Sequence, residues 1–235
     1  MAQIPSPGID DARIPPLTPG EATRLKHCFL RDLAANIGVI VDSGRAHGAV
    51  IFAPPKAEPL LREFVQKSFK LFPQRGDTPA DILSKATHDL FSRGFSSVCL
   101  VNSDSPTVPR AALEFGVKSL SGSGDRIVLG ALDRGGYYLI GFKQEHRDLL
   151  ERVPSVAHIM VHMKARTAAM GVKIEMLPPG FEVTDARGLN RLCKELFSPD
   201  SQQQTPFAPY TKQYLARLLE IYGADQLSPD LARGA

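Results

Sequence analysis

The sequence contains no tryptophan, and only 7% of its residues are aromatic. So few aromatic side chains disfavour base-stacking platforms and aromatic cages for cations as the basis of its function. Cysteine is scarce as well: Cys28, Cys99 and Cys193 are odd in number, widely spaced and form no CxxC pair. This pattern argues against a disulfide framework and a zinc site, and it favours a reducing, cytoplasmic location.

Excess charge and long apolar runs are also lacking. The chain has 28 basic and 25 acidic residues, giving a net charge of +3, and its Lys and Arg residues form no stripe. Nucleic acid is therefore not expected as a partner. Because no apolar run approaches the roughly 20 residues that span a bilayer, no membrane span is expected either. The first residues have neither the basic nor the apolar region of a secretory signal.

Several motifs that would identify a catalytic class are missing. The sequence has no G-x-S-x-G, P-loop or G-x-G-x-x-G, so lipase-type, Walker-type and dinucleotide-binding interpretations lack support. His158 and His162 are spaced to share a helix face, but Ile159 stands where the HExxH motif needs Glu. Two exposed or half-buried histidines that bind no metal are the favoured interpretation.

The apolar residues that are present indicate an α/β protein. Hydrophobic residues make up 43% of the 235 positions, enough for one main globular domain. Short apolar segments alternate with helical patterns, and this alternation predicts a three-layer αβα sandwich with a mainly parallel sheet. Strands are expected at 49–53, 97–101, 127–130, 137–141 and 172–176, and helices at 18–37, 56–70, 78–94, 109–120, 145–152, 157–170 and 186–197.

Composition divides the chain into three parts. Residues 1–197 are expected to form the main domain. Residues 198–209 are rich in Ser, Gln and Pro, which is typical of a linker. Residues 210–235 are then expected to form a helical C-terminal extension.

The strongest local signal for chemistry is the segment 102–106, Asn-Ser-Asp-Ser-Pro, directly after the apolar run 97–101. Ligands of open α/β sheets bind beyond the carboxyl ends of strands, and Asp104 stands at such an end. A carboxylate there suits a divalent cation that bridges phosphates. A structural role for Asp104 in capping the next turn is an equal alternative.

A second signal is the segment 133–138, Asp-Arg-Gly-Gly-Tyr-Tyr. Its glycines would let the backbone approach a ligand closely. On the residues alone, a strand-to-strand turn that needs positive φ is the favoured alternative. In the segment 74–77, Gln-Arg-Gly-Asp, Arg75 either offers its guanidinium to an anionic ligand or lies in a solvated loop.

Taken together and in this order, these segments resemble a known family, the GT-A-like bacterial glycosyltransferases of the arsenosugar-biosynthesis type. This family is related to the nucleotide-diphospho-sugar transferases. The resemblance covers residues 4–196. The family's Ser-Asp-x-Pro is similar to residues 103–106, its Asp-Gly-Gly-Tyr-Tyr-Leu-Ile-Gly to residues 133–141, and its Gln-Arg-Gly to residues 74–76.

The resemblance implies a GT-A fold and a nucleotide pocket. It implies Mg²⁺ or Mn²⁺ held by Asp104, with Asp104 and Asp133 as catalytic residues. A nucleotide sugar or nucleotide and a small-molecule acceptor are the implied ligands. The implied donor-binding residues are Ser103, Arg13, Arg75, Arg134, Gly135 and Gly136.

The chain departs from the family at four places. Residues 11–14 read Asp-Ala-Arg-Ile where the family has Lys-Thr-Arg-Leu, so a carboxylate, Asp11, replaces a cation that would attract a diphosphate. Residues 182–185, Glu-Val-Thr-Asp, replace an Asp-x-Asp-Thr pattern, and Arg134 replaces a glycine. The family's first strand is cut short, which leaves a sheet edge unpaired or filled by a second protomer in a homodimer.

Three hypotheses follow. The first is a divalent-metal-dependent glycosyltransferase that moves a sugar from a nucleotide-sugar donor to a small-molecule acceptor. The second is a nucleotidyltransferase on the same fold that uses a nucleoside triphosphate. The third is a catalytically degenerate relative with a binding or partner role.

Overall fold

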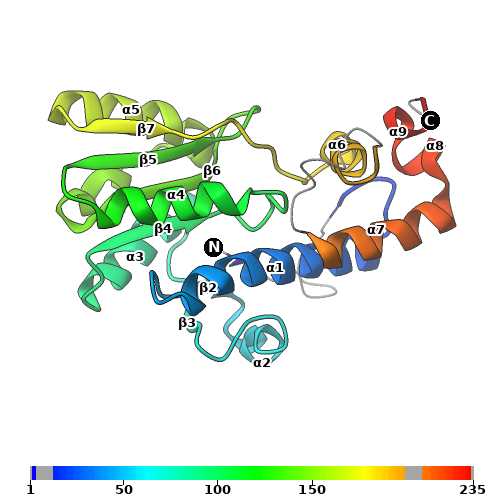
Figure 1. The fold of residues 1–235 in the computed structure, drawn as a ribbon, viewed down its shortest axis with the longest axis horizontal. Helices are drawn as coiled ribbons and strands as arrows, with labels where there is room; N and C mark the ends of the chain where they lie inside the picture. The colour runs from blue at the N-terminus through cyan, green and yellow to red at the C-terminus, as the bar shows by residue number, and fades with distance from the viewer. Residues whose placement is uncertain (1, 4–12, 199–207, 234–235) are drawn as a thin grey trace.

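The computed structural model describes residues 2–3, 13–198 and 208–233, and its strands form two sheets (Figure 1). Strands β1 (Ala2–Gln3), β2 (Ala49–Ala53) and β3 (Lys70–Pro73) form a parallel sheet in the order β1-β2-β3. The larger sheet has the order β4-β6-β5-β7. Its strands are β4 (Ser97–Val101), β5 (Arg126–Ala131), β6 (Tyr137–Lys143) and β7 (Lys173–Met176).

The larger sheet is mixed, which corrects the expectation of a mainly parallel sheet. Strand β6 runs antiparallel to both β4 and β5, whereas β5 and β7 are parallel. The reason is local: only the short segment 132–136 separates β5 from β6, and a parallel pair would need a crossover of a dozen or more residues.

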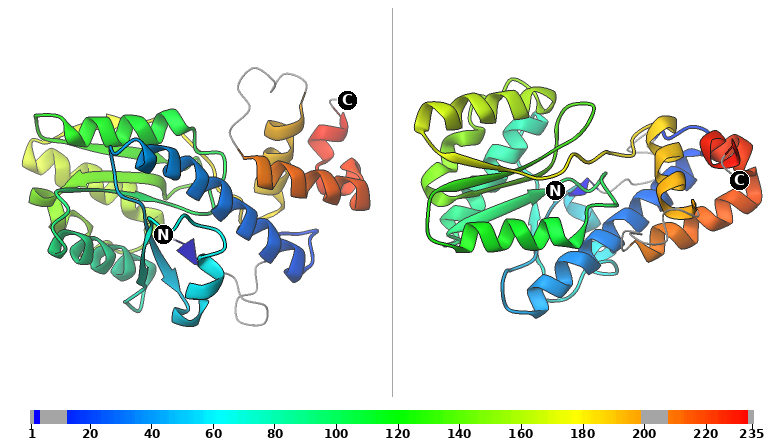
Figure 2. Two further views of the ribbon diagram at one scale, coloured as in Figure 1. Left: turned by 60° about the horizontal axis from the view of Figure 1, so that its bottom comes forward. Right: turned by 45° about the horizontal axis from the view of Figure 1, so that its top comes forward.

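Helices cover both faces of this sheet, as the alternating pattern predicts (Figure 2). On one face the core combines apolar side chains from α3 (Pro79–Ser92), the 3-10 segment Gln144–Leu150 and α5 (Ile159–Met170). On the other face it combines α4 (Arg110–Ser121) with the C-terminal half of α1 (Pro19–Asp42). The αβα layering therefore holds around the larger sheet.

Helix α1 begins where the sequence predicts. The Glu21 amide donates to Thr18 Oγ1 at 3.3 Å, and the Thr18 amide donates to Glu21 Oε2 at 2.8 Å, so the two residues form a capping box. Pro19 takes the first helical position, where its missing N–H breaks no bond.

A second core lies around the N-terminal half of α1, beyond the sheets. Here α7 (Pro209–Tyr222) packs against α1, and α6 (Ala186–Phe197) shares the same apolar core. The short helices α8 (Ala224–Leu227) and α9 (Pro229–Arg233) pack between α6 and α7. Figure 1 shows α7 lying along α1. The expected C-terminal helix is thus confirmed, and it shares a core with the first helix of the chain.

The segment 56–70 is not the single helix that its pattern suggests. It contains a 3-10 turn (Pro55–Ala57) and one helical turn, α2 (Glu58–Leu61), and β3 begins at Lys70. Proline fits only the first turn of a helix, so Pro55 and Pro59 start short turns rather than extend one helix. The other differences are smaller: the helix expected at 145–152 is a 3-10 segment, and most of the linker expected at 198–209 lies outside the described residues.

Within the described ranges, no helix combines the length and the apolar character that a membrane span requires.

Candidate functional site

Asp104 lies just beyond the carboxyl end of β4, in a loop fixed by its own hydrogen bonds. The Asn102 amide donates to the Tyr138 carbonyl at 3.0 Å, which ends the pairing of β4 with β6. The Asp104 amide then donates to Asn102 Oδ1 at 3.1 Å, forming a local turn. The Asp104 carbonyl accepts from the Val183 amide at 2.8 Å, so the loop is tied to the segment before α6.

Charged groups from distant parts of the chain surround the Asp104 carboxylate. Lys26 on α1 places its Nζ 3.4 Å from Oδ1 and 3.5 Å from Oδ2 of Asp104. Glu182 faces the same region: burial raises the pKa of its carboxyl group, and the negative charges of Asp104 and Asp185 raise it further. Carboxylates brought together in this way favour a proton or a cation between them.

The turn between β5 and β6 has the geometry that favours glycine. Gly135 has φ 92° and Gly136 has φ 85°, and the Leu132 amide donates to the Gly136 carbonyl at 3.3 Å. The expected positive-φ turn is therefore confirmed. The Asp133 amide donates to the Gly180 carbonyl at 3.0 Å, so this turn joins the segment that follows β7.

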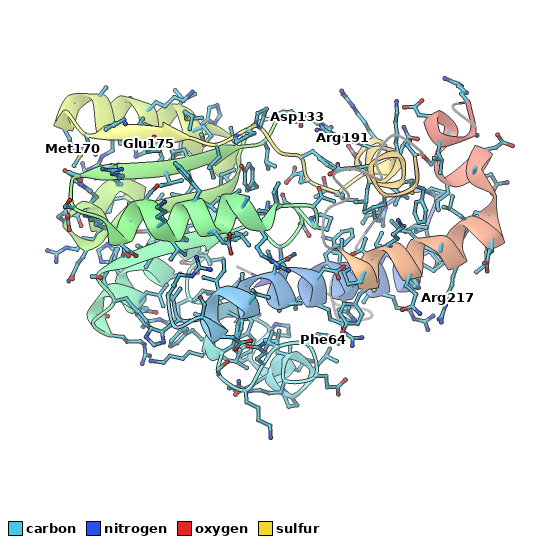
Figure 3. All side chains as sticks on the ribbon, in the orientation of Figure 1. Phe64, Asp133, Met170, Glu175, Arg191 and Arg217 are labelled. Carbon is cyan, nitrogen blue, oxygen red and sulfur yellow. The ribbon has the colours of Figure 1, made fainter. Side chains whose placement is uncertain are left out.

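Two ion pairs connect the β5–β6 turn to α6. Asp133 accepts from Arg191, and Arg134 donates to Asp185, the N-cap residue of α6. The hydrogen bond from Arg134 holds the pKa of the Asp185 carboxyl below its usual range. Figure 3 shows Asp133 and Arg191 close together where the sheet meets α6. The positive charge of Arg134 thus stabilises the protein's own carboxylate.

A cavity of about 440 Å³ opens beside the Asp104 loop. Its walls come from α4, the segment after β7 and α6, and are mainly apolar, including Phe115 and Phe181. Besides Tyr138, four lining side chains are polar: Ser105, Thr107, Arg191 and Glu195. The Ser105 hydroxyl oxygen is buried without a hydrogen-bond partner among the described residues, and burial raises the pKa of Glu195. A mainly apolar cavity with a few convergent polar groups is typical of a small-molecule site.

The sequence-predicted residues do not all gather here. Arg75 pairs with Asp89 on α3 rather than with the groups around Asp104. Ser103, next to Asp104, lines a different cavity between β2 and β4. Gly135 packs close to the backbone of residue 157, and Arg13 is exposed at the start of the described segment 13–198.

Three residues of this site carry no motif: Lys26, Arg191 and Glu195. Lys26 lies on a helix 78 positions before Asp104, and single-sequence periodicity gives no signal for such a pair. Two others had a sequence signal: Ser105 lies in the segment 102–106, and Glu182 is part of the altered acidic pattern at residues 182–185.

The donor set around Asp104 fits a hard divalent cation. Mg²⁺ at phosphate sites is commonly bound by one or two carboxylates together with substrate phosphates, and Asp104 and Glu182 supply two carboxylates. Among the described residues, the groups that bring together three donor atoms suited to a metal lie elsewhere: His88, Asp148 and Glu151, and Asp125, Glu145 and His146. A cation beside Asp104 would therefore need oxygen atoms from its ligand.

Comparison with family models identifies the chain. The model described as "Uncharacterized protein conserved in bacteria (DUF2064)" matches residues 36–155, just over half of the 235 residues. The chain belongs to this family. The region matched by DUF2064 includes Asp104 and the turn 132–136, whereas Lys26, Glu182 and α6 lie outside it. A search of curated proteins gives no match.

One solved structure shares the fold of this DUF2064 member over nearly the whole chain. A crystal structure from Desulfovibrio desulfuricans G20, provisionally assigned as a nucleotide-diphospho-sugar transferase, superposes with a TM-score of 0.76 at 18% identity. The match covers 93% of this chain and 94% of that one. At this identity, the match establishes the fold alone.

Two further structures match less well. CMP:2-keto-3-deoxy-manno-octonic acid synthetase complexed with CTP gives a TM-score of 0.47 at 14% identity, covering 81% of this chain and 93% of that one. A 4-diphosphocytidyl-2C-methyl-D-erythritol synthase gives 0.38 at 15% identity, covering 73% and 80%. These TM-scores are too low to establish a shared fold.

Proposed function

We propose that the protein is a glycosyltransferase of the nucleotide-sugar-dependent kind, with its donor diphosphate bound beside Asp104. The observation that carries the proposal is the convergence of Asp104, Lys26 and Glu182 at the carboxyl end of β4, next to the 440 Å³ cavity. A strand end lined with charged groups is where open α/β sheets bind phosphorylated ligands. The transferase-like fold and the resemblance of residues 103–106 and 133–141 support the same assignment.

Lys26 and a divalent cation have complementary parts in this proposal. Asp104 and Glu182 would hold Mg²⁺ or Mn²⁺. The cation would neutralise the negative charge of the leaving diphosphate. The Lys26 ammonium already balances one of the two carboxylates, so we expect the metal to bind together with the nucleotide rather than alone. The remaining arginines near the site, Arg134 and Arg191, position α6 through their carboxylate partners.

The acceptor is assigned to the cavity beside Asp104. In the transfer, the bond between the anomeric carbon and the distal phosphate oxygen breaks, and its electron pair leaves with the nucleoside diphosphate. A hydroxyl oxygen of the acceptor forms the new bond to that carbon and loses its proton to Glu195. Burial raises the pKa of Glu195, which strengthens it as a base, and the carboxylate lines the cavity.

Thermal unfolding with nucleoside diphosphates and nucleotide sugars, with and without Mn²⁺, tests the donor site. A ligand at 100 times its dissociation constant adds about 2.7 kcal/mol of stability, which gives a clear shift. We expect a shift with one nucleotide class that depends on Mn²⁺ and is lost in Asp104→Asn. The control is Asp225→Asn, which changes an exposed carboxylate on α8 and leaves the shift intact.

The transfer reaction separates the competing functions. Release of a nucleoside diphosphate supports glycosyl transfer, whereas release of pyrophosphate from a triphosphate would replace it with nucleotidyl transfer. Glu195→Gln should lower turnover while leaving the donor-dependent thermal shift in place, because the proposal assigns Glu195 to the acceptor cavity and not to the donor diphosphate. A folded protein that binds no nucleotide in any of these titrations would instead establish the degenerate, non-catalytic alternative.

A further inference from the structure

The cavity beside Asp104, assigned above to the acceptor, has walls that are apolar from the interior to the protein surface. Phe115 on α4 and Met176 at the end of β7 line it and are both exposed, so the apolar wall reaches the surface. Phe181 lines the cavity too and is buried. Exposed apolar side chains that gather at one cavity are typical of a site that binds an apolar group.

The backbone of the segment after β7 offers this cavity few hydrogen-bonding groups. Pro178 and Pro179 have no N–H to donate. The amides of Leu177 and Gly180 already donate to carbonyls of β5, both at 2.8 Å. The Pro178 carbonyl accepts from the Tyr138 hydroxyl at 2.9 Å, which also satisfies the polar end of Tyr138. A ligand with many hydroxyl groups would therefore lose its water here without gaining equivalent partners.

The charged side chains of the cavity are engaged as well. Arg191 donates to Asp133, so its positive charge is already balanced. Burial raises the pKa of the Glu195 carboxyl group, and a hydrogen bond from the Thr107 side chain opposes this shift. Among the described residues that line the cavity, an anionic ligand would thus meet a carboxylate and no unbalanced cation.

The Ser105 hydroxyl differs from these groups because it has no partner. Ser105 is 2% exposed, and its Oγ is buried without a hydrogen-bond partner in the described part of the chain. Buried hydroxyl groups are nearly always hydrogen-bonded, so this one indicates a ligand that completes its bonds. One ligand hydroxyl placed between Ser105 and Glu195 would accept from Ser105 and donate to Glu195, the base of the transfer proposed above.

We propose that the acceptor is an uncharged alcohol with an apolar body rather than a sugar or another polyol. Its hydroxyl binds between Ser105 and Glu195, and its apolar body lies along Phe115, Met176 and Phe181. This acceptor class rests on the proposed function, because the cavity receives an acceptor only if the donor binds beside Asp104.

Four small molecules separate the features of this alcohol. 2-Phenylethanol has the hydroxyl and the apolar body, ethylbenzene lacks the hydroxyl, phenylacetate carries a negative charge, and glucose lacks the apolar body. Calorimetric titration of the full chain should show binding of 2-phenylethanol, about tenfold weaker binding of phenylacetate and no measurable binding of glucose. Glucose that binds as tightly as 2-phenylethanol would overturn the proposal.

Ser105→Ala tests the contact with the alcohol hydroxyl. The substitution should weaken the binding of 2-phenylethanol by about fivefold, the effect of one hydrogen bond, and leave that of ethylbenzene unchanged. Because a loss of fold would weaken both ligands alike, the difference between them reports the hydrogen bond. Equal effects on the two ligands would mean that Ser105 does not hold the alcohol, and the proposal would be wrong.

Met176→Gln tests the apolar wall, and the chain offers a matched control. Met176 is 48% exposed and lines the cavity, whereas Met170 is 46% exposed at the end of α5. Figure 3 shows Met170 at the opposite end of the sheet from Asp133. Met176→Gln should weaken the binding of 2-phenylethanol and ethylbenzene severalfold, and Met170→Gln should leave both unchanged. Equal affinities in the two variants would contradict the proposed position of the apolar body.

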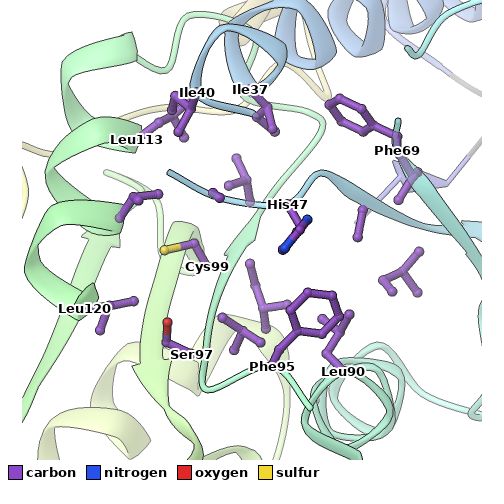
Figure 4. Close-up of a pocket in the computed structure, with 18 of the residues that line it drawn as sticks. Ile37, Ile40, His47, Phe69, Leu90, Phe95, Ser97, Cys99, Leu113 and Leu120 are labelled. Atoms are coloured by element: carbon purple, nitrogen blue, oxygen red, sulfur yellow. The ribbon is translucent and has the colours of Figure 1, made fainter. Parts of the chain in front are cut away.

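A second apolar cavity is an alternative place for these molecules to bind. It has a volume of about 320 Å³ and lies between β2 and β4, where Figure 4 shows Ile37 and Ile40 among its lining residues. Arg45 and His47 line it as well, so it is not wholly apolar. In methyl NMR spectra, 2-phenylethanol should shift the Met176 signal and leave those of Ile37 and Ile40 in place. Shifts confined to Ile37 and Ile40 would overturn the proposal.

Turnover distinguishes a failure of this proposal from a failure of the proposed function. With the nucleotide sugar that gives the Mn²⁺-dependent thermal shift, 2-phenylethanol should raise the release of nucleoside diphosphate about tenfold above the rate with water alone, because its hydroxyl is held in place. Glucose should not raise it. Stimulation by glucose alone would overturn the alcohol as acceptor and leave glycosyl transfer standing. If no nucleotide sugar gives the thermal shift, the proposed function is wrong, whatever the alcohol titration gives.

Discussion

Among single residues, Asp32 connects the two ends of the fold. It is fully buried on α1, yet its carboxylate accepts hydrogen bonds from the amides of Tyr210 at 3.0 Å and Thr211 at 2.8 Å. These are the first amides of α7, which no residue within that helix can satisfy. Arg31 adds to the junction by stacking over the Tyr210 ring, 4.0 Å from its centroid.

Replacing Asp32 should therefore destabilise the whole protein. Asp32→Ala leaves the buried Thr211 amide and the part-buried Tyr210 amide without their acceptor, and we expect a loss of about 2 kcal/mol in the free energy of unfolding. Urea unfolding measures this loss of stability. Asp225→Ala, on the exposed surface of α8, should change stability by less than about 0.5 kcal/mol. Equal effects of the two substitutions would contradict the capping role.

The ionisation of the same carboxyl group should make the stability of the protein depend on pH. Burial raises the pKa of Asp32 above its ordinary value of 3.8, against the opposing hydrogen bonds from Thr211 and Tyr210. A group with a raised pKa in the folded state contributes stability below its unfolded pKa and loses it as pH rises through the folded pKa. The stability of the native protein relative to Asp32→Asn should thus fall as pH increases from about 3.8. A constant difference across this range would refute the assignment.

Contacts between residues far apart in the sequence, such as Asp32 with Thr211 or Lys26 with Asp104, could not be predicted from the sequence. Asp104 is visible because it follows a buried strand and begins a turn, both of which are local patterns. Its partner Lys26 is one cation among many on an amphipathic helix, and only the packing of α1 beside the β4 loop selects it.

Among the secondary-structure elements, α6 is the one whose bounds local sequence patterns predict best. The same helix lies against the candidate site. Its expected range, 186–197, is the observed one, because Asp185 is a strong N-cap and accepts from the Gly188 amide at 2.8 Å. Strand β3 shows the opposite case. Its four residues, Lys70–Pro73, are too short for a reliable alternation, and their pairing with β2 determines their conformation.

Because the start of α6 is closely packed, we expect that adding a methyl group there will destabilise the protein. A Cβ at Gly188 would lie 2.5 Å from the Glu182 carbonyl oxygen and 3.0 Å from Val183 Cα. Gly188→Ala must therefore displace the backbone of residues 182–183, which is bonded to the Asp104 loop, at about 1–3 kcal/mol. Chemical denaturation measures this loss, and nucleotide titration should show weaker donor binding.

Gly20→Ala is the matched control, because it also adds a methyl group in the first turn of a helix. No atom lies within 4 Å of the Cβ position at Gly20, so the substitution should be neutral or stabilise by up to about 1 kcal/mol. If Gly188→Ala is equally well tolerated, the close approach of α6 to residues 182–183 is not a constraint on the site.

For the molecule as a whole, the αβα arrangement could be predicted because strand and helix patterns alternate, and the fold match supports it. The division of the sheet could not be predicted, because the pairing partner of each strand depends on contacts across the molecule rather than on its own residues. The shared core of α1, α6 and α7 was equally hidden, because each helix shows only its own apolar face.

This shared core should make the C-terminal helix essential to global stability. Leu215 on α7 is fully buried against this core, whereas Ile221 on the same helix is 71% exposed. Leu215→Ala should lower the free energy of unfolding by about 2–5 kcal/mol through lost burial and the cavity it leaves. Ile221→Ala should have almost no effect. If far- and near-UV signals show that Leu215→Ala melts α7 alone, α7 is an independently unfolding unit.

The packing of α7 along α1 also has a consequence for how the protein is made. Helix α1 leaves the ribosome early, but most of the side chains that share a core with Leu25 and Phe29 belong to residues 181–231. Until synthesis is almost complete, half of the first helix has an apolar face with no native partner, and nascent chains with such faces are prone to association. The protein thus depends on its last residues to protect its first, and stalled or truncated translation products should be the species that need chaperones.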